Sequence, residues 1–201
     1  MSEQRIPPRP FADWGRDFFE ALSVMRLPGV PARTPEEVER LRRDRPVPGM
    51  VGIFSWHPAL AGAFFAFNSH LFSSTLSDRV RELVTVRVCW LRGGEYEWEQ
   101  HVRMARRAGL SDAEIDAISV GPDAPAWGAA DAALLRAVDE MVADRYIGDD
   151  SWKQLSEHLD RQQLMDLVFT VGAYDLLAMA FNTFGLPLDP GMSGFPAAAK
   201  D

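Results

Sequence analysis

The sequence predicts an all-α protein. No segment alternates apolar and polar residues in the manner of a half-buried strand. Apolar residues instead recur at helical spacing in one segment after another, and several of these segments begin at a capping residue or end at a glycine. Apolar residues make up 47% of the 201-residue chain, which is enough for a core between packed helices.

The N-terminal part predicts an arm followed by helices. Residues 1–10 are polar and proline-rich and are expected to be disordered or draped over the protein. A helix is expected over residues 11–25, and a short one begins at Thr34, with Pro35 at its first position and acidic residues in its first turn. Residues 50–56 form either a helix or an extended segment. His57-Pro58 opens a helix whose apolar positions are Leu60, Phe64, Phe67 and Leu71.

Residues 79–110 predict two helices joined by a glycine hinge. Ser77 or Asp78 caps the first helix, in which Leu83, Val86 and Trp90 recur at helical spacing. Gly93-Gly94 forms the hinge, and the second helix ends at Gly109.

Helices continue to the end of the chain. Ser111 and Glu114 form a capping box that opens a short helix ending near residue 120, and a longer helix covers residues 129–146. Asp149-Asp150-Ser151 caps the next helix, and the last runs over residues 162–184 with Gly185 beyond it. Asp175 and Asn182 share one face of that last helix, where they either line a polar patch of a pocket or, as we favour, satisfy helix ends.

Composition argues against several classes of partner. The formal charge of -8 argues against a nucleic-acid surface and against an anionic membrane surface. The longest uninterrupted apolar runs, 58–67 and 176–181, are shorter than the roughly 20 residues of a membrane span, and the N-terminus lacks a signal-peptide core. The single cysteine, Cys89, excludes an intrachain disulfide and favours a reducing, cytoplasmic location.

The central helix pair carries the candidate catalytic residues. Glu97 and His101 are four residues apart, so they share one helical face and can hydrogen bond to each other. A carboxylate beside an imidazole raises the pKa of the ring, which suits a base near neutral pH. Glu82 is expected as a second carboxylate, and Tyr96 either donates to a developing oxyanion or simply packs. The alternative is that Glu97 and His101 form an ordinary surface pair worth about 0.2–0.5 kcal/mol.

The same segment resembles the carboxymuconolactone decarboxylase family, which includes the alkyl hydroperoxidase D proteins. The resemblance runs from about Pro58 to Asp189, and its spacing of Glu82, Glu97 and His101 is specific for the family but not for one reaction. The other matching residues are Arg81, Leu83, Gly94-Glu95-Tyr96, Trp98, Ala108 to Ser111, Leu134 to Glu140, Asp166 to Val168 and Met179 to Gly185.

One departure from the family separates two chemistries. The peroxidase branch carries a Cys-x-x-Cys pair before the histidine, and here Gly94 and Glu97 occupy those positions. Because disulfide exchange needs a second sulfur, one subunit with Cys89 alone cannot run a dithiol cycle. A glutamate four residues before His101 is closer to the decarboxylase branch.

The resemblance therefore implies an alkyl hydroperoxidase D-like helical bundle with Glu82, Glu97, His101 and Tyr96 in an apolar cavity. A lyase is favoured over an oxidoreductase: acid–base decarboxylation or isomerisation of a small carbonyl or lactone acid, without cofactor or metal. Two alternatives stay open. One is a peroxidase-like enzyme using Cys89 with an external thiol, and the other is a ligand-binding or scaffold protein.

The resemblance also implies an assembly and a division of the chain. The family forms homo-oligomers, so a dimer, trimer or hexamer is expected. The chain is divided into an N-terminal arm and helical extension over residues 1–57, a family-like helical domain over 58–189 and a flexible tail over 190–201.

Overall fold

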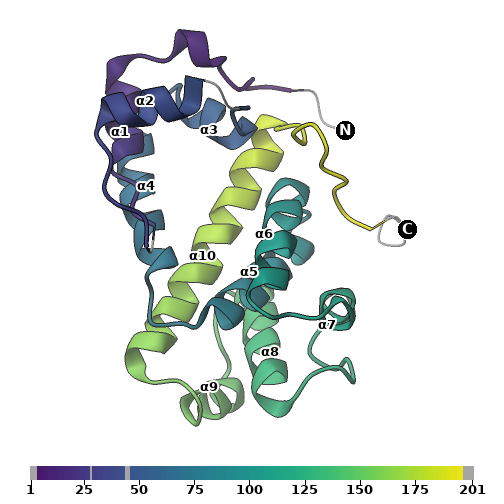
Figure 1. The fold of residues 1–201 in the computed structure, drawn as a ribbon. Helices are drawn as coiled ribbons and strands as arrows, with labels where there is room; N and C mark the ends of the chain where they lie inside the picture. The colour runs from purple at the N-terminus through teal and green to yellow at the C-terminus, as the bar shows by residue number, and fades with distance from the viewer. Residues whose placement is uncertain (1–3, 28, 44–45, 197–201) are drawn as a thin grey trace. The chain divides into compact units, whose positions relative to one another are not determined.

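The computed structural model describes residues 4–27, 29–43 and 46–196. Within these ranges the regular secondary structure is helical throughout, so the all-α prediction is confirmed (Figure 1). The elements are η1 (Phe11–Asp13), α1 (Arg16–Ser23), α2 (Pro35–Arg43), α3 (Gly49–Phe54), α4 (Pro58–Phe72), α5 (Asp78–Leu91), α6 (Glu95–Arg107), α7 (Asp112–Ala117), α8 (Ala129–Asp144), α9 (Asp149–Ser156) and α10 (Arg161–Phe184).

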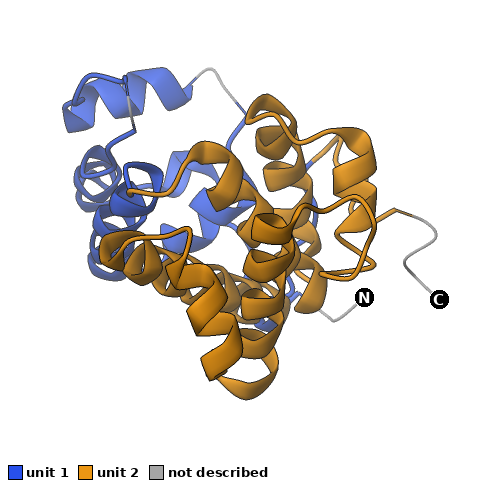
Figure 2. Ribbon diagram, turned by 90° about the horizontal axis from the view of Figure 1, so that it is seen from below, with its two compact units in different colours: residues 1–74, 183–189 blue, residues 75–182, 190–201 orange. Residues whose placement is uncertain are grey.

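The chain divides into two compact units. Unit 1 comprises residues 1–74 and 183–189, and unit 2 comprises residues 75–182 and 190–201 (Figure 2). The division at residues 57/58 and 189/190 that the sequence suggested rests on the extent of the family resemblance, and it stays a prediction.

Unit 1 is built on α1 and α4. α1 packs against both α4 and α2, and α3 packs against α4. Phe54 stacks on Phe64 with ring centroids 4.9 Å apart. The described part of the N-terminal arm is draped over the protein and not disordered. The amides of Arg5 and Ile6 donate to Phe184 O, and the amide of Arg9 donates to Gly52 O. Residues 1–3 lie outside the described ranges.

Local capping explains where the unit 1 helices begin. The single helix expected over residues 11–25 is wrong: Trp14 and Gly15 have extended backbones that separate η1 from α1. Thr34 caps α2 as expected, since its Oγ1 accepts from the Glu37 amide at 3.2 Å. The ambiguous segment 50–56 is resolved as a helix, α3, over most of its length.

Unit 2 places α5 at its centre, packed against α6 and α8. Ser77 is the cap of α5, since its side chain accepts from the Val80 amide, and the capping box of Ser111 and Glu114 opens α7 as predicted. α9 packs on α8. The expected cap of α9 is wrong, because Gly148 precedes the helix while Ser151 lies inside it and bonds to Glu140 at 2.6 Å.

Of the two polar residues, Asn182 supports a helix end, which was the favoured interpretation, whereas Asp175 forms an ion pair with a side chain. Asn182 Nδ2 donates to Arg92 O, at the C-terminal end of α5, at 3.0 Å. Asp175 accepts from Arg92 Nε at 2.5 Å. α10 begins at Arg161, one residue earlier than expected, after an Asp160 side chain that accepts from the Gln163 amide.

α10 is also long and apolar enough to cross a membrane by length and composition, although 56% of its apolar window is buried inside the protein. Such burial is typical of a core helix. Asp166 and Asp175 interrupt the apolar residues of α10, so the helix contains no long unbroken apolar run.

Candidate active site

The site is built on the α5–α6 hairpin. Gly93 turns the chain with a φ of +62°, a left-handed conformation that favours glycine. Gly94 then lies in tight surroundings, because a Cβ added there would stand 3.2 Å from Ala178 Cβ on α10 and 3.2 Å from Glu97 Oε2. The absence of a side chain at residue 94 therefore lets α6 start close to α10, beside which it runs (Figure 1).

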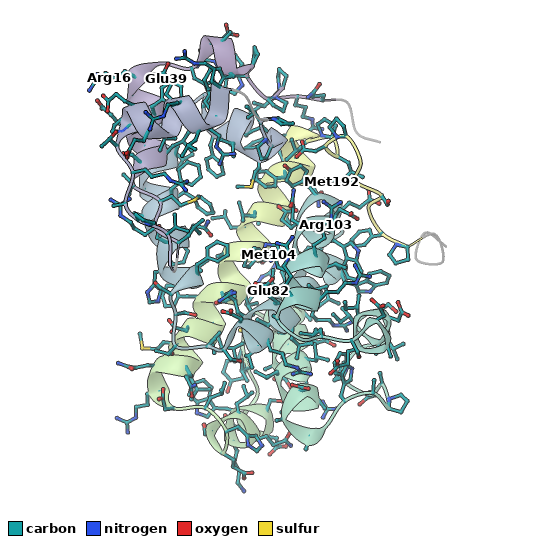
Figure 3. The ribbon with its side chains drawn as sticks, in the orientation of Figure 1. Arg16, Glu39, Glu82, Arg103, Met104 and Met192 are labelled. Carbon is teal, nitrogen blue, oxygen red and sulfur yellow. The ribbon has the colours of Figure 1, made fainter. Side chains whose placement is uncertain are left out.

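Glu82 and His101 are joined by a buried hydrogen bond across the hairpin. His101 Nδ1 lies 2.7 Å from Glu82 Oε2, and the two residues are only 7% and 1% exposed. The other carboxylate oxygen of Glu82 accepts from Arg81 Nε at 3.1 Å, and Arg81 also binds Asp78. With both its oxygens held, Glu82 (labelled in Figure 3) fixes the orientation of the imidazole ring.

This pairing corrects the partner expected from the sequence. His101 was expected to pair with Glu97 one turn earlier on the same helix, whereas its hydrogen-bond partner is Glu82 on α5. A shared helical face permits a contact at four residues but does not require it. The alternative of an exposed surface pair is also wrong, because Glu97 and His101 are both buried.

Glu97 is buried without a hydrogen-bond partner. It is 4% exposed, and among the described residues neither of its carboxylate oxygens has a partner. Burial raises its pKa from 4.5 to about 7, against a smaller lowering effect of the residue's own backbone. At neutral pH a substantial fraction of Glu97 is therefore a neutral carboxylic acid, which can donate a proton.

Two buried tyrosines lie on α6 and α10, and the sequence identified only one of them. Tyr96 is 3% exposed and packs edge-on against Phe181 with centroids 5.9 Å apart. Tyr174 on α10 packs edge-on against the His101 ring at 4.6 Å, and its pKa is raised by burial and then by the charge of Glu82. Tyr174 lies 73 residues from His101 in sequence. The one sequence feature that could have identified it is its position as a lone tyrosine in an apolar helix.

Cys89 lies near the same carboxylates but is an unreactive kind of thiol. It is fully buried, as expected from its place in an apolar run. Burial raises its pKa well above the ordinary value, and the charges of Glu97 and Glu82 raise it further. A thiol under these conditions resists forming the thiolate that redox chemistry requires.

The four predicted site residues thus all lie buried in unit 2. Glu82 and His101 are brought into direct contact, and Glu97 and Tyr96 lie buried on α6. Within the described ranges no group of three His, Cys, Asp or Glu side chains has the arrangement of a metal site. A cavity at these side chains stays a prediction.

Similar solved structures share this fold at low identity. An uncharacterised peroxidase-related protein from Ralstonia eutropha, described as an alkylhydroperoxidase AhpD core, has a TM-score of 0.73 and 17% identity, with 96% of each chain covered. An Agrobacterium tumefaciens protein of unknown function, described as a candidate AhpD antioxidant defence protein, has a TM-score of 0.64 and 24% identity over 68% of this chain and 94% of its own. The debrominase Bmp8 has a TM-score of 0.66 and 10% identity, with 94% of each chain covered.

The sequence comparisons agree with the structural ones. No curated protein sequence matches the chain. Residues 58–140, which include α4, the α5–α6 hairpin and most of α8, match the model of the carboxymuconolactone decarboxylase family. Residues 58–140 are therefore similar to the carboxymuconolactone decarboxylase family, and the chain shares its fold with the AhpD-like structures.

Proposed function

We propose that this chain is an enzyme that performs cofactor-free acid–base chemistry on a small carbonyl or lactone acid. The observation that carries the proposal is the buried bond between Glu82 and His101. Glu82 holds Nδ1 of the ring, so Nε2 is the nitrogen that exchanges a proton with a substrate. Glu82 is a positioning residue, and His101 is the catalytic base.

Glu97 supplies the complementary acid. Its pKa of about 7 provides a neutral carboxylic acid near physiological pH, apart from the Glu82–His101 pair. In a decarboxylation, the bond to the carboxylate carbon breaks, CO₂ leaves, and the electron pair moves into the carbonyl to give an enolate. Glu97 then protonates the enolate carbon. In an isomerisation, His101 removes the α-proton and Glu97 returns a proton at the new position.

Two other functions compete with this proposal. The peroxidase-related and debrominase names of similar structures belong to those proteins, and they make a redox enzyme the main rival. That reaction would need Cys89 and an external thiol, and the buried, high-pKa state of Cys89 argues against it. The third candidate is a protein that binds a ligand and never converts it.

The test compares His101→Gln with the wild type and with His158→Ala, an exposed histidine at the end of α9. Gln is close to His in size and carries no titratable nitrogen, so the fold should survive while the base is lost. We expect His101→Gln to slow the isomerisation of a small unsaturated lactone acid, the reaction in which His101 removes the α-proton, by about 10²- to 10⁴-fold. Product release is followed by NMR in D₂O, and circular dichroism confirms the fold.

The opposite results separate the rivals. Normal turnover in a folded His101→Gln variant removes His101 from the reaction. Peroxide consumption with a thiol donor that is lost in Cys89→Ser favours the redox enzyme. Mass spectrometry of the denatured protein identifies any small molecule retained through purification, and an unconverted ligand there favours the binding protein.

A further inference from the structure

Three helices of the candidate active site each carry a buried polar side chain without a hydrogen-bond partner. Within the described ranges, buried side-chain oxygens lack a partner in Ser74, Thr85, Glu97 and Thr170. Thr85 lies on α5, Glu97 on α6 and Thr170 on α10, and both threonines are fully buried. A buried hydroxyl without a partner loses its hydrogen bonds to water and gains none in return, so its presence calls for an explanation.

Packing alone does not call for a hydroxyl at either threonine. Valine is β-branched like threonine, and it places a methyl group where threonine places its hydroxyl. Thr85 stands between Val84 and Val86, which are both buried. Thr170 precedes Val171, which is buried as well. The two hydroxyls are therefore better explained by a group that binds them and is not part of the folded chain.

Two hydrogen bonds show that α5 and α10 run in the same direction within unit 2. The Thr75 amide, just before α5, donates to Asp166 Oδ2 in the first turns of α10 at 2.7 Å. At the other end of α5, Asn182 Nδ2 in the last turn of α10 donates to Arg92 O at 3.0 Å. Residues near the middle of α5 therefore lie at the level of residues near the middle of α10.

Thr170 lies on the face of α10 that meets His101. It is four residues before Tyr174, so the two residues stand one turn apart, about 5.4 Å, on one face of the helix. Tyr174 in turn packs edge-on against the His101 ring, with ring centroids 4.6 Å apart. The Thr170 side chain is therefore directed to the side of α10 on which His101 lies.

Thr85 lies on α5 between two residues whose contacts are known. It is three residues after Glu82, whose carboxylate bonds to His101. It is also seven residues before Arg92, which binds Asp175 on α10. Because residues three or seven apart share a side of a helix, the Thr85 side chain is directed toward α6 and α10.

We propose that Thr85 and Thr170 bind the carbonyl oxygen of the substrate and stabilise the negative charge that develops on it, an inference that rests on the proposed function. When His101 removes the α-proton, the electron pair of the C–H bond forms a carbon–carbon double bond and the carbonyl pair moves to oxygen, giving an enolate. The two hydroxyls donate hydrogen bonds to this oxygen and keep their protons. The carbonyl forms again when Glu97 returns a proton to carbon.

The neighbouring side chains favour a neutral carbonyl over an acid group at this subsite. The carboxyl groups of Glu82 and Glu97 are buried on α5 and α6, and a substrate carboxylate placed among them would meet like charge. Neutral hydroxyls bind a carbonyl oxygen without adding a further buried charge. The subsite therefore takes the ring carbonyl of a lactone acid.

Replacing each threonine by valine separates a catalytic hydroxyl from a structural one. Loss of an unpartnered buried hydroxyl should raise the melting temperature of Thr85→Val and Thr170→Val. Turnover of the unsaturated lactone acid should fall, with kcat reduced about 10²-fold and KM changed by less than about tenfold, because the oxygen becomes charged only as the enolate forms. Thr85→Ser keeps the hydroxyl and should retain most of the wild-type kcat. Thr183→Val, at an exposed position of α10, is the control and should change neither kcat nor the melting temperature.

Binding of paraconate measures the same subsite without turnover. Paraconate is a saturated lactone acid, so it presents the ring carbonyl but has no double bond to move. Titrated into wild-type protein that is isotope-labelled at the threonine methyl groups, it should shift the NMR signals of Thr85 and Thr170 saturably and leave that of Thr183 in place. The dissociation constant should rise about two- to tenfold in each valine variant, which is the loss expected for one hydrogen bond.

The outcomes distinguish this inference from the proposed function. Normal kcat in both valine variants, with His101→Gln slowed, would overturn the role of the hydroxyls and leave the acid–base reaction in place. Normal turnover in His101→Gln removes the base and the enolate with it, and the paraconate titration then decides whether the subsite binds a carbonyl. Signals of Thr85 and Thr170 that do not respond to paraconate overturn the subsite whatever the enzyme converts, and this titration of the wild type needs no variant to fold.

Discussion

Replacing Glu97 by Gln should remove a pH dependence from the stability of the folded protein. Glu97 has a folded-state pKa of about 7 and an ordinary value of 4.5, because burial disfavours its charged form. Below about pH 4.5 the side chain is protonated in both the folded and the unfolded state, so its burial does not make the free energy of unfolding depend on pH. As pH rises through the window from about 4.5 to 7, the folded state holds a proton that the unfolded state has lost, so the free energy of unfolding falls.

The size of the effect follows from the same two values. The interval between 4.5 and about 7 corresponds to a loss of roughly 3 kcal/mol above pH 7, at 1.36 kcal/mol for each pH unit. Gln has nearly the same shape as a protonated Glu and never ionises. The difference in unfolding free energy between wild type and Glu97→Gln should therefore shift by about 3 kcal/mol in favour of the variant between roughly pH 4.5 and pH 8.

Urea denaturation of both proteins across this pH range measures the difference directly. Any packing effect of the substitution itself is independent of pH and cancels in the comparison of slopes. Glu99→Gln, on the same helix and paired with Arg103, serves as the control and should retain the wild-type slope. Parallel stability profiles for wild type and Glu97→Gln would refute the reasoning, because they would show that Glu97 titrates alike in the folded and unfolded chains.

Two further predictions concern buried groups outside the Glu82–His101 pair. Asp139→Ala should lower the free energy of unfolding by about 3–5 kcal/mol, because it removes the carboxylate that binds the buried Arg87 through two hydrogen bonds. The control variant Asp123→Ala removes an exposed ion pair and should lower the free energy of unfolding by less than about 1 kcal/mol. Chemical denaturation of both variants checks this, and equal losses would contradict it. Cys89 should be alkylated by iodoacetamide at least roughly 100-fold more slowly in the native than in the urea-unfolded protein, as measured by mass spectrometry; equal rates would show that the thiol is open.

The sequence by itself predicted most of the helical elements and named the candidate site residues. Helix starts at Thr34, Ser77 and Ser111 depend on a side chain bonding to an amide only three residues away, so local sequence is sufficient to predict them. Trp14 and Gly15 broke the first expected helix through backbone conformations that a pattern of apolar residues does not encode.

Only the tertiary structure decided how the site residues are paired. Glu82 reaches His101 because the α5–α6 hairpin folds one helix onto the other, while sequence spacing had favoured Glu97 as the partner. The contact of Tyr174 with His101 joins segments 73 residues apart, and no local pattern carries such information.

The tertiary structure also decided which apolar face of α10 is covered. Both faces of this helix are rich in apolar residues, so periodicity could not separate Leu177, which is buried, from Leu176, which is exposed. Burial is likewise what gives Glu97 its raised pKa, and burial depends on every element packed around a side chain. The residue types are therefore set by the sequence, but their charge states and exposed surfaces are set by the packing of distant segments.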